Sequence, residues 1–236
     1  MTTLYCCSLI DKKPRYGSND SNIIPVLAGA SLVKDEIKRE LSVQGWEMDD
    51  TGQNISKLNQ IWGDLTVLYW AWRNSTKESW GVCQYRRKWS ECDVINSRSD
   101  VLYVPYPVKL FEGSVKRQYE WCHGMFPAYE ISIRLARSKK IPLTIEMLDA
   151  AWNQDLLYSC NMARGPKNLM DIFCELTFAT MEAFYADSMD ICLQLQGYQR
   201  RSIAFTAERM ITAIMLHSEF FFGTNKVRCA SMELIQ

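Results

Sequence analysis

The sequence predicts an α/β fold, a three-layer sandwich in which a mostly parallel central sheet is flanked by helices. The chain opens with a β-favouring segment, Leu4–Leu9, and later short apolar segments alternate with segments of helical periodicity. Strands that alternate with helices are typical of a largely parallel sheet covered by helices. The 236 residues contain no internal repeat, low-complexity tract or obvious linker, which favours one continuous domain.

The N-terminal half is predicted to contain three strands and one helix. The first strand ends before Asp11, and the polar, Pro-containing segment Asn19–Gly29 is expected to be a loop. A helix is expected between an N-cap at Asn59 and a stop at Asn74-Ser75. Its apolar residues recur at three- and four-residue steps, and they are Ile61, Leu65, Leu68, Tyr69 and Trp72. The other two strands are expected at Trp80–Tyr85 and Val101–Val104.

Helical periodicity dominates the C-terminal half. The predicted helices cover Ser114–Cys122, Tyr129–Lys139, Ile145–Trp152, Leu169–Tyr185 and Ser202–Phe221. Between them, Leu156–Met162 is predicted to be a short buried strand, closed by Arg164-Gly165-Pro166. Ligands of parallel sheets lie beyond the carboxyl ends of the strands, so we expect Tyr85-Arg86-Arg87 and Asn161-Met162 at the mouth of a binding site.

The composition argues against nucleic acid or an anionic membrane as a partner. Lys plus Arg and Asp plus Glu both total 27, so no net charge attracts a polyanion. No apolar stretch approaches the ~20 residues that a membrane-spanning helix needs. The nine cysteines are scattered without a C-x-x-C pair, which favours reduced thiols and a cytoplasmic location over disulfides or zinc.

Three groups of residues are candidates for chemistry, each with a structural alternative. Arg86 and Arg87 follow an apolar strand and could bind phosphate, although adjacent side chains diverge and one of them could form an ion pair instead. The turn from Asp49 to Asn54 offers carboxylates and amides around Gly52, or it simply caps the next segment. Glu208 is either a general base or half of a structural pair with Arg209.

Several motifs of other enzyme classes are absent from the sequence. It contains no G-x-x-x-x-G-K-[ST] loop, no G-x-G-x-x-G fingerprint and no G-x-S-x-G elbow, which argues against P-loop NTPases, Rossmann dehydrogenases and α/β-hydrolases. The D-x-D pair that often clamps a divalent metal on a nucleotide diphosphate is missing too. Glu91-Cys92-Asp93 comes nearest, which makes Asp93 the one candidate metal ligand. His123 could contact phosphate or an acceptor, or be a packing residue.

A series of motifs in register resembles a family of glycosyltransferase-like domains of capsular polysaccharide and lipopolysaccharide biosynthesis, long labelled a domain of unknown function. The matching motifs are I-P-V-x-x-G (Ile24–Gly29), D-x-x-G-x-N-I-S-x-x-N (Asp49–Asn59), D-L-T-x-x-Y-W-A-W-x-N (Asp64–Asn74), G-V-C-x-Y-R-R (Gly81–Arg87), Q-Y-x-x-x-H (Gln118–His123), N-M (Asn161-Met162) and F-x-x-E-R (Phe205–Arg209). Two departures stand out. Gln84 replaces a histidine that is frequent in the family, and the acidic residue often found shortly after the motif His is missing after His123.

The resemblance implies a GT-A-type fold with a nucleotide-binding half, about residues 1–110, and an acceptor half, about 111–236. It implies transfer of a hexose, galactose by default, from a UDP-linked donor to a glycan acceptor, with Mn²⁺ or Mg²⁺ as an optional ion. We expect Arg86 or Arg87 to bind the diphosphate and Asp49, Asp50 or Asp64 to bind the donor sugar or ribose. Asn161 and Glu208 are expected at the reacting sugar and acceptor. The donor set is completed by Gln84, Tyr85 and Asn54, and the acceptor set by Tyr119, His123 and Arg209. The alternative is a non-catalytic nucleotide-sugar or carbohydrate-binding module of a larger synthase with further glycosyltransferase domains.

Overall fold

The computed structural model describes residues 2–11, 22–90 and 98–234. The chain forms two compact units built from interleaved segments. Unit 1 comprises residues 1–106, 162–171 and 228–236, and unit 2 comprises residues 107–161 and 172–227. Unit 1 thus contains two later segments besides the N-terminal part. The division into a nucleotide-binding half and an acceptor half stays a prediction.

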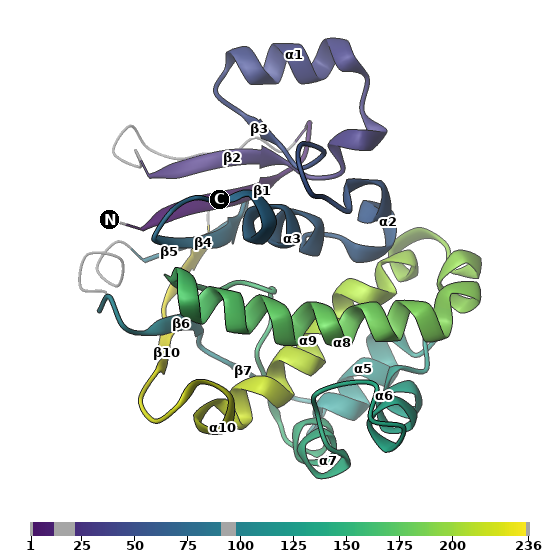
Figure 1. Cartoon of the computed structure of the whole chain (residues 1–236). Coiled ribbons are helices and arrows are strands. Elements are labelled where there is room, and N and C mark those ends of the chain that lie inside the picture. The colour runs from purple at the N-terminus through teal and green to yellow at the C-terminus, as the bar shows by residue number, and fades with distance from the viewer. Residues whose placement is uncertain (1, 12–21, 91–97, 235–236) are drawn as a thin grey trace. The chain divides into compact units, whose positions relative to one another are not determined.

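Unit 1 is built around a sheet (Figure 1). Among the described residues the sheet has nine strands, in the order β10-β6-β9-β4-β1-β2-β3, with β5 paired to β4 and β11 to β5. The strands are β1 (Thr3–Ser8), β2 (Ile23–Leu27), β3 (Glu47–Met48), β4 (Ser79–Gln84), β5 (Arg87–Trp89), β6 (Leu102–Pro105), β9 (Arg164–Pro166), β10 (Val227–Ala230) and β11 (Met232–Leu234).

The centre of the sheet is parallel. Strand β1 pairs in parallel with β2 and β4, and β2 pairs in parallel with β3. Strand β9 joins β4 and β6 in antiparallel register, as β5 joins β4. The predicted α/β fold with a parallel central sheet and flanking helices is therefore confirmed. Because the four parallel strands β1 to β4 run the same way, their carboxyl ends, after Ser8, Leu27, Met48 and Gln84, lie along one edge.

Strand β2 occupies part of the segment that was predicted to be a loop, so that prediction is wrong for Ile23–Leu27. Proline was taken as a strand breaker, but Pro25 lies opposite Cys6 of β1. On the other side, β3 pairs only with Val26 and Leu27. The position of Pro25 therefore requires no ladder hydrogen bond toward β3, which is where a strand tolerates proline.

The helix predicted from Asn59 consists of two helices, α2 (Asn59–Trp62) and α3 (Leu65–Asn74). They are separated by Gly63, whose φ of 54° and ψ of −133° interrupt the helix. Asn59 lies inside α2 instead of capping it, and its side chain donates to Gly63 O at 2.8 Å across the break. The predicted stop at Asn74-Ser75 is confirmed. Helix α3 packs against β1 and β4.

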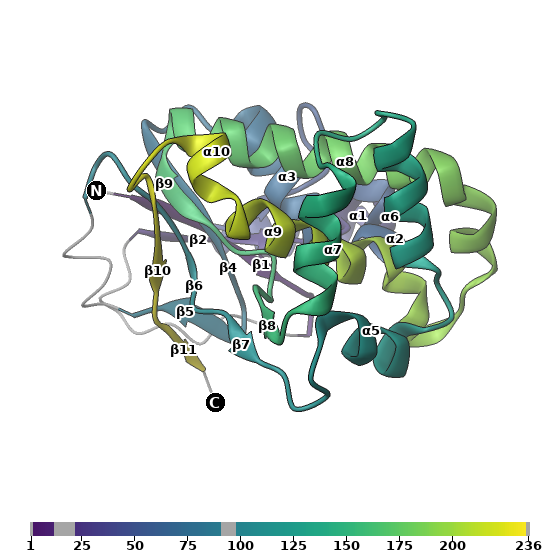
Figure 2. The same cartoon turned by 90° about the horizontal axis from the view of Figure 1, so that it is seen from below.

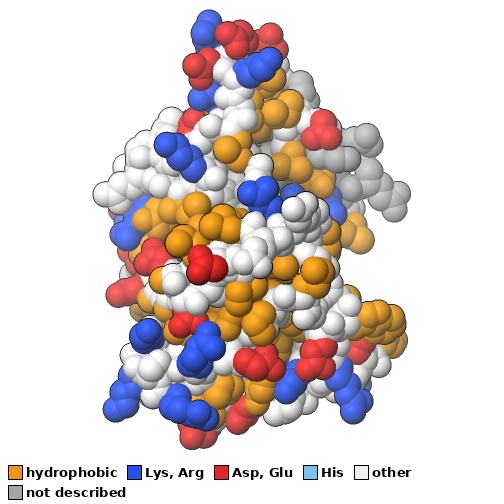
Figure 3. All heavy atoms as spheres, turned by 90° about the vertical axis from the view of Figure 1, so that its right-hand side faces the viewer, with side chains coloured by type: hydrophobic (Ala, Val, Ile, Leu, Met, Phe, Trp, Pro, Cys, Tyr) orange, Lys and Arg blue, Asp and Glu red, His pale blue; other side chains and the backbone are white. Residues whose placement is uncertain are grey.

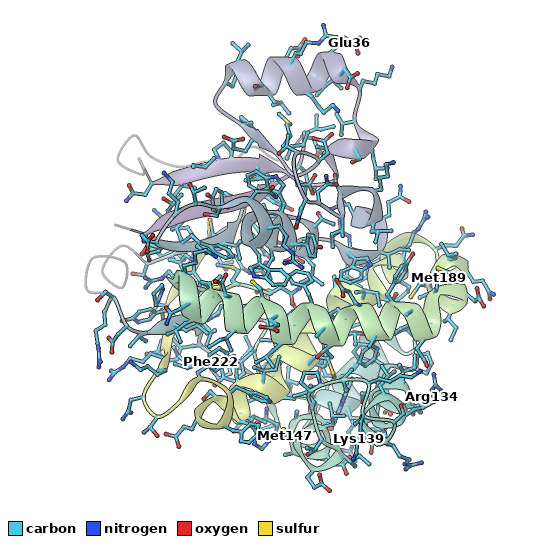
Figure 4. All side chains as sticks on the ribbon, viewed as in Figure 1. Glu36, Arg134, Lys139, Met147, Met189 and Phe222 are labelled. Atoms are coloured by element: carbon cyan, nitrogen blue, oxygen red, sulfur yellow. The ribbon has the colours of Figure 1, made fainter. Side chains whose placement is uncertain are left out.

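Helix α1 (Asp35–Val43) was not predicted. Six of the nine residues in its sequence, DEIKRELSV, are polar or charged, and only Leu41 is buried. Acidic and basic side chains are intermixed at the top of Figure 3, where α1 lies, and Glu36 points away from the strands in Figure 4. Two short 3₁₀ helices, η1 (Ala30–Leu32) and η2 (Ser56–Leu58), complete the described part of unit 1.

Unit 2 is mainly helical (Figure 2). Its elements are β7 (Val108–Lys109), α5 (Val115–His123), α6 (Ala128–Arg137), α7 (Ile145–Asn153), β8 (Leu156–Leu157), most of α8 (Lys167–Gln194), η3 (Gly197–Arg201), α9 (Ser202–Leu216) and α10 (Ser218–Phe222). Helix α9 is buried on almost every side and packs against α5 and α7, so it forms the core of the unit. Arg134, labelled on α6 in Figure 4, forms an ion pair with Asp187 of α8.

The predicted helices of this half are present, with two differences. Helix α8 extends to Gln194 through a kink at Ser188, and the last predicted helix is broken at His217 into α9 and α10. The predicted strand Leu156–Met162 is reduced to β8, because Cys160 and Asn161 have φ values of 82° and 49° that end any strand. Arg164-Gly165-Pro166, predicted as a closing turn, forms β9 instead.

Eight cysteines lie in the described residues, and no two of them form a disulfide. No helix in the described part of the chain is both long and apolar enough to cross a bilayer.

Candidate functional site

The carboxyl edge of the parallel strands in unit 1 carries most of the predicted donor residues. Asp49 and Asp50 follow β3, and Tyr85-Arg86-Arg87 follow β4. In the sheet β2 and β1 lie between these two strands. At a strand spacing of about 4.8 Å, the two groups are roughly 14 Å apart along the edge. Both groups lie at the same edge of the sheet, but they are separate from each other.

Asp49 is fully buried, and its carboxylate is completely hydrogen-bonded. One oxygen, Oδ2, accepts from Gly29 N at 2.8 Å and from Thr66 Oγ1 at 2.7 Å. The other, Oδ1, accepts from Ala30 N at 2.9 Å and from Ser56 Oγ at 2.5 Å. These four bonds fill the four lone-pair positions of a carboxylate. Asp49 therefore fastens the turn after β2, η2 and α3 together, and it has no acceptor position left for a ligand.

The other members of this turn are also held by protein groups. Asp50 accepts from Lys38 Nζ at 3.0 Å. The amide of Asn54 donates to Asp50 O and Gly52 O and accepts from Ser56 N. The predicted binding residues Asp50 and Asn54 thus shape the turn, which agrees with the alternative that it is a structural element.

Replacing Gly52 by alanine is expected to destabilise this turn. Gly52 has a φ of 53°, and a Cβ added to it would come within 2.0 Å of Asn74 Oδ1. That oxygen accepts from Gln53 N, so the clash breaks a contact between the turn and α3. We expect a loss of about 3 kcal/mol in the free energy of unfolding, from backbone strain together with the clash.

The measurement is urea denaturation, with Gly45→Ala as the matched control. Gly45 has a φ of 82°, but its Cβ would meet nothing within 4 Å. The Gly45→Ala control should lose only the part of the free energy of unfolding that comes from backbone strain, about 1 kcal/mol. Equal losses in the two variants would show that the contact with Asn74 contributes nothing.

Asp64, Gln84 and Arg87 form a hydrogen-bonded chain at the end of β4. Gln84 Nε2 donates to Asp64 Oδ2 at 2.6 Å, and Arg87 Nη1 donates to Gln84 Oε1 at 2.9 Å. Gln84 and Arg87 are paired across β4 and β5, so Tyr85 and Arg86 form the two-residue turn of a hairpin. Arg86 is exposed, with its guanidinium 5.8 Å from the Tyr85 ring centre. Arg86 is thus exposed, whereas Arg87 is held by the amide of Gln84 and not, among the described residues, by the ion pair that the sequence allowed.

In unit 2, the predicted acceptor residues lie on α5, on α9 and in the turn before residue 162. Glu208 on α9 accepts from Cys160 N through Oε1 at 2.7 Å and from Arg209 Nη1 through Oε2 at 2.9 Å. These bonds use two of the four lone-pair positions of the carboxylate. The Glu208 side chain is 19% exposed, so the remaining positions can be reached from solvent.

The turn that contains Asn161 is fastened to one face of α9. Tyr158 N donates to Thr212 Oγ1 at 3.0 Å, and Asn161 Nδ2 donates to Ala204 O at 3.3 Å. The residues of α9 that accept hydrogen bonds from this turn are Ala204, Glu208 and Thr212. They follow one another at four-residue steps, which places them on one side of the helix. They hold Cys160 and Asn161 in two consecutive left-handed conformations. Strained backbone of this kind concentrates at functional sites.

Arg209 is buried and joins α9 to α5. Its guanidinium donates to Phe205 O at 2.7 Å and to Gln118 Oε1, and lies 5.0 Å from the ring centre of Tyr119. Tyr119 is itself buried, and its hydroxyl lies 3.2 Å from Thr206 Oγ1. Burial raises the pKa of Tyr119 to about 12, which keeps the phenol neutral. Gln118 was noted only as part of a motif, and its contact with Arg209 adds it to this cluster.

His123 is buried at the end of α5, with its ring stacked on Phe205 at 3.9 Å between centres. The pKa of His123 is lowered to about 4, mainly by burial and also by the nearby Arg209 charge, and a hydrogen bond with Gln199 partly offsets both. The imidazole is therefore neutral at physiological pH. A neutral ring can hydrogen-bond a sugar hydroxyl, but it cannot pair with a phosphate as a cation.

The free energy of unfolding is expected to fall between pH 6.5 and pH 4 because of His123. In this range the unfolded chain binds a proton that the native imidazole excludes, so stability is present above pH 6.5 and is lost as the pH falls. The loss should be on the order of 1–3 kcal/mol. Denaturant titrations at a series of pH values would measure it.

The control for this pH dependence is His123→Gln. The variant should show a flatter dependence over the same range, because glutamine does not titrate. If the two proteins lose stability in parallel, the effect comes from other groups.

The candidate metal ligand Asp93 lies outside the described residues. Within residues 2–11, 22–90 and 98–234, no three His, Cys, Asp or Glu side chains come together as metal ligands. We therefore assign no described residue to a divalent ion.

One solved structure similar to the chain is the apo form of the bifunctional glycosyltransferase WbbM, with a TM-score of 0.72 and 20% sequence identity. The match covers 100% of this chain but only 45% of the WbbM chain. At this level of identity the likeness shows a shared fold.

No curated protein matches the chain. A family model, described as domain of unknown function DUF4422, matches residues 9–219. Since this match covers nearly the whole chain, the chain belongs to the DUF4422 family.

Proposed function

We propose that this protein is a glycosyltransferase that moves a hexose, galactose by default, from a UDP-linked donor to a hydroxyl of a growing glycan. The observation that carries the proposal is the pair of arginines at the carboxyl edge of the parallel strands. Arg86 is exposed there, and Arg87 uses only one of its N–H groups on a described residue. A guanidinium has five N–H donors, and such donors suit a diphosphate. The shared fold with WbbM, a protein named as a bifunctional glycosyltransferase, supports the same proposal.

In the proposed reaction each group has a separate task. The acceptor oxygen forms a bond to the anomeric carbon of the sugar while the bond from that carbon to the diphosphate breaks, and UDP leaves. Arg86 and Arg87 stabilise the charge that develops on the leaving diphosphate. Glu208 takes the proton of the acceptor hydroxyl, because its carboxylate keeps unfilled lone-pair positions and is partly exposed. Asp49 has none left and therefore has a structural role.

Donor binding tests this proposal. UDP-galactose should raise the melting temperature, because a ligand that binds only the native state stabilises it. Arg86→Ala and Arg87→Ala should each weaken binding about 10- to 100-fold through the loss of charge-assisted hydrogen bonds. Arg39→Ala is the matched control, since Arg39 is an exposed arginine on α1. No stabilisation by UDP-galactose or other nucleotide sugars, with or without Mn²⁺, would contradict the proposal.

The second candidate is a non-catalytic module that binds a nucleotide sugar or a carbohydrate. The observation in its favour is that the matched part of WbbM is less than half of that chain, so a comparable unit there belongs to a larger protein. Hydrolysis of the donor distinguishes the two candidates. A transferase is expected to release sugar slowly to water in the absence of an acceptor, whereas a binding module should release none.

A further inference from the structure

Asp64 lies at the N-cap position of α3, yet its side chain does not cap the helix. An aspartate at this position normally accepts a hydrogen bond from a backbone N–H of the first turn, which stabilises the helix by about 1 kcal/mol. Instead, Asp64 Oδ2 accepts from the side chain of Gln84 at 2.6 Å. The carboxylate is directed to the end of β4 and not to its own helix, which points to a task other than helix stability.

Gln84 connects an acceptor to a donor, which fixes its orientation. A carboxylate only accepts hydrogen bonds and a guanidinium only donates them. The amide nitrogen must therefore face Asp64, and the amide oxygen must face Arg87. Glutamine is one of the few neutral side chains that can do both at once. A glutamate here would repel Asp64, and a lysine would repel Arg87.

No described carboxylate neutralises the positive charge of Arg87. No ion pair joins Arg87 to any described carboxylate, and the amide of Gln84 stands between it and Asp64. Arg87 is only partly buried, and one of its N–H groups is bonded to a described residue. The guanidinium is thus held in place while most of its donors stay available to an anion. The exposed Arg86 is its neighbour in the hairpin turn.

We propose that Gln84 and Asp64 are positioning residues, which orient Arg87 toward the diphosphate of the donor without touching the donor themselves. This inference rests on the proposed function, and it replaces two expectations: that Asp64 binds the donor sugar or ribose, and that Gln84 belongs to the donor-binding set. The fixed guanidinium presents its remaining N–H groups in one geometry, so less conformational freedom is lost when the diphosphate binds. Gln84 and Asp64 therefore affect the binding of the phosphates and not the binding of the nucleoside.

The test compares the binding of UDP and uridine by calorimetry. Gln84→Ala should weaken UDP binding about tenfold, in line with the loss of one well-oriented charge-assisted contact. Its affinity for uridine, which has no phosphate, should not change. Asp64→Ala should behave like Gln84→Ala, whereas Asp64→Asn should recover most of the loss because its amide oxygen still accepts from Gln84.

Gln60→Ala is the matched control, since Gln60 is an exposed glutamine on α2 in the same unit. A merely structural role for Gln84 would weaken uridine and UDP binding equally, and that outcome would overturn the inference. So would a Gln84→Ala variant that binds UDP as the unmodified protein does, although the proposed function would then still stand. If the unmodified protein binds neither UDP nor any nucleotide sugar, both the inference and the proposed function fail.

Discussion

Replacing Asp49 by alanine is expected to lower the free energy of unfolding by about 4 kcal/mol, a large part of the roughly 5–15 kcal/mol that stabilises a typical domain. The substitution leaves two buried backbone N–H groups, those of Gly29 and Ala30, without an acceptor. It also removes the partner of two hydroxyls, on Ser56 and Thr66. Buried donors that lose their acceptor account for most of the expected cost. Denaturant unfolding monitored by circular dichroism would measure it.

Asp50→Ala is the control for this prediction. Asp50 is the neighbouring aspartate, but its side chain is 17% exposed and pairs with Lys38 near the surface. Removing a pair of this kind typically costs less than about 1 kcal/mol. Asp49→Asn is informative as well, because an asparagine keeps one acceptor oxygen and should fall between the two. A loss below about 1 kcal/mol for Asp49→Ala would show that the network is not a structural clamp.

Replacing Glu208 by glutamine is expected to lower the turnover of sugar transfer by about 10²- to 10⁴-fold, the range for loss of a general base. Glutamine has the same shape, and its oxygen can still accept from Cys160 N, so the turn at Asn161 should persist. The amide cannot take a proton from the acceptor hydroxyl. Donor binding, measured as the rise in melting temperature with UDP-galactose, should remain, because the diphosphate is assigned to residues of unit 1.

The control is Glu182→Gln, which changes an exposed glutamate on α8 of the same unit. It should transfer sugar at the rate of the unmodified protein. Glu208→Ala, which removes both contacts of the carboxylate, should lose stability as well as turnover. A Glu208→Gln variant with near-normal turnover would remove Glu208 from the proposed chemistry. It would leave the ion pair with Arg209 as its role.

Local sequence patterns predicted the helices and strands that contain many apolar residues. They failed where the tertiary structure determines where a helix ends or which residues are buried. The apolar steps from Ile61 to Trp72 predicted one helix, but the backbone of Gly63 breaks it. On α3 the predicted apolar positions Leu65 and Leu68 are buried, but Tyr69 and Trp72 are only partly buried. Trp70, which was not predicted, is the buried tryptophan of that helix. Its indole N–H donates to Thr51 Oγ1 at 2.8 Å, in a turn far along the chain. The spacing of apolar residues within one helix contains no information about a hydrogen-bond partner in another segment.

The sequence by itself determined the alternation of strands and helices and the parallel centre of the sheet. It also determined that the arginine pair follows a strand, since these features depend on the local spacing of apolar residues. Only the tertiary structure decided which carboxylates already accept hydrogen bonds from the protein at all their lone-pair positions. Asp49 meets Gly29 and Thr66 from 20 and 17 residues away, and Glu208 meets Cys160 from 48 residues away. Hydrogen bonds between residues so distant form only when the chain has folded, and they separate a structural aspartate from a glutamate that can still accept a proton.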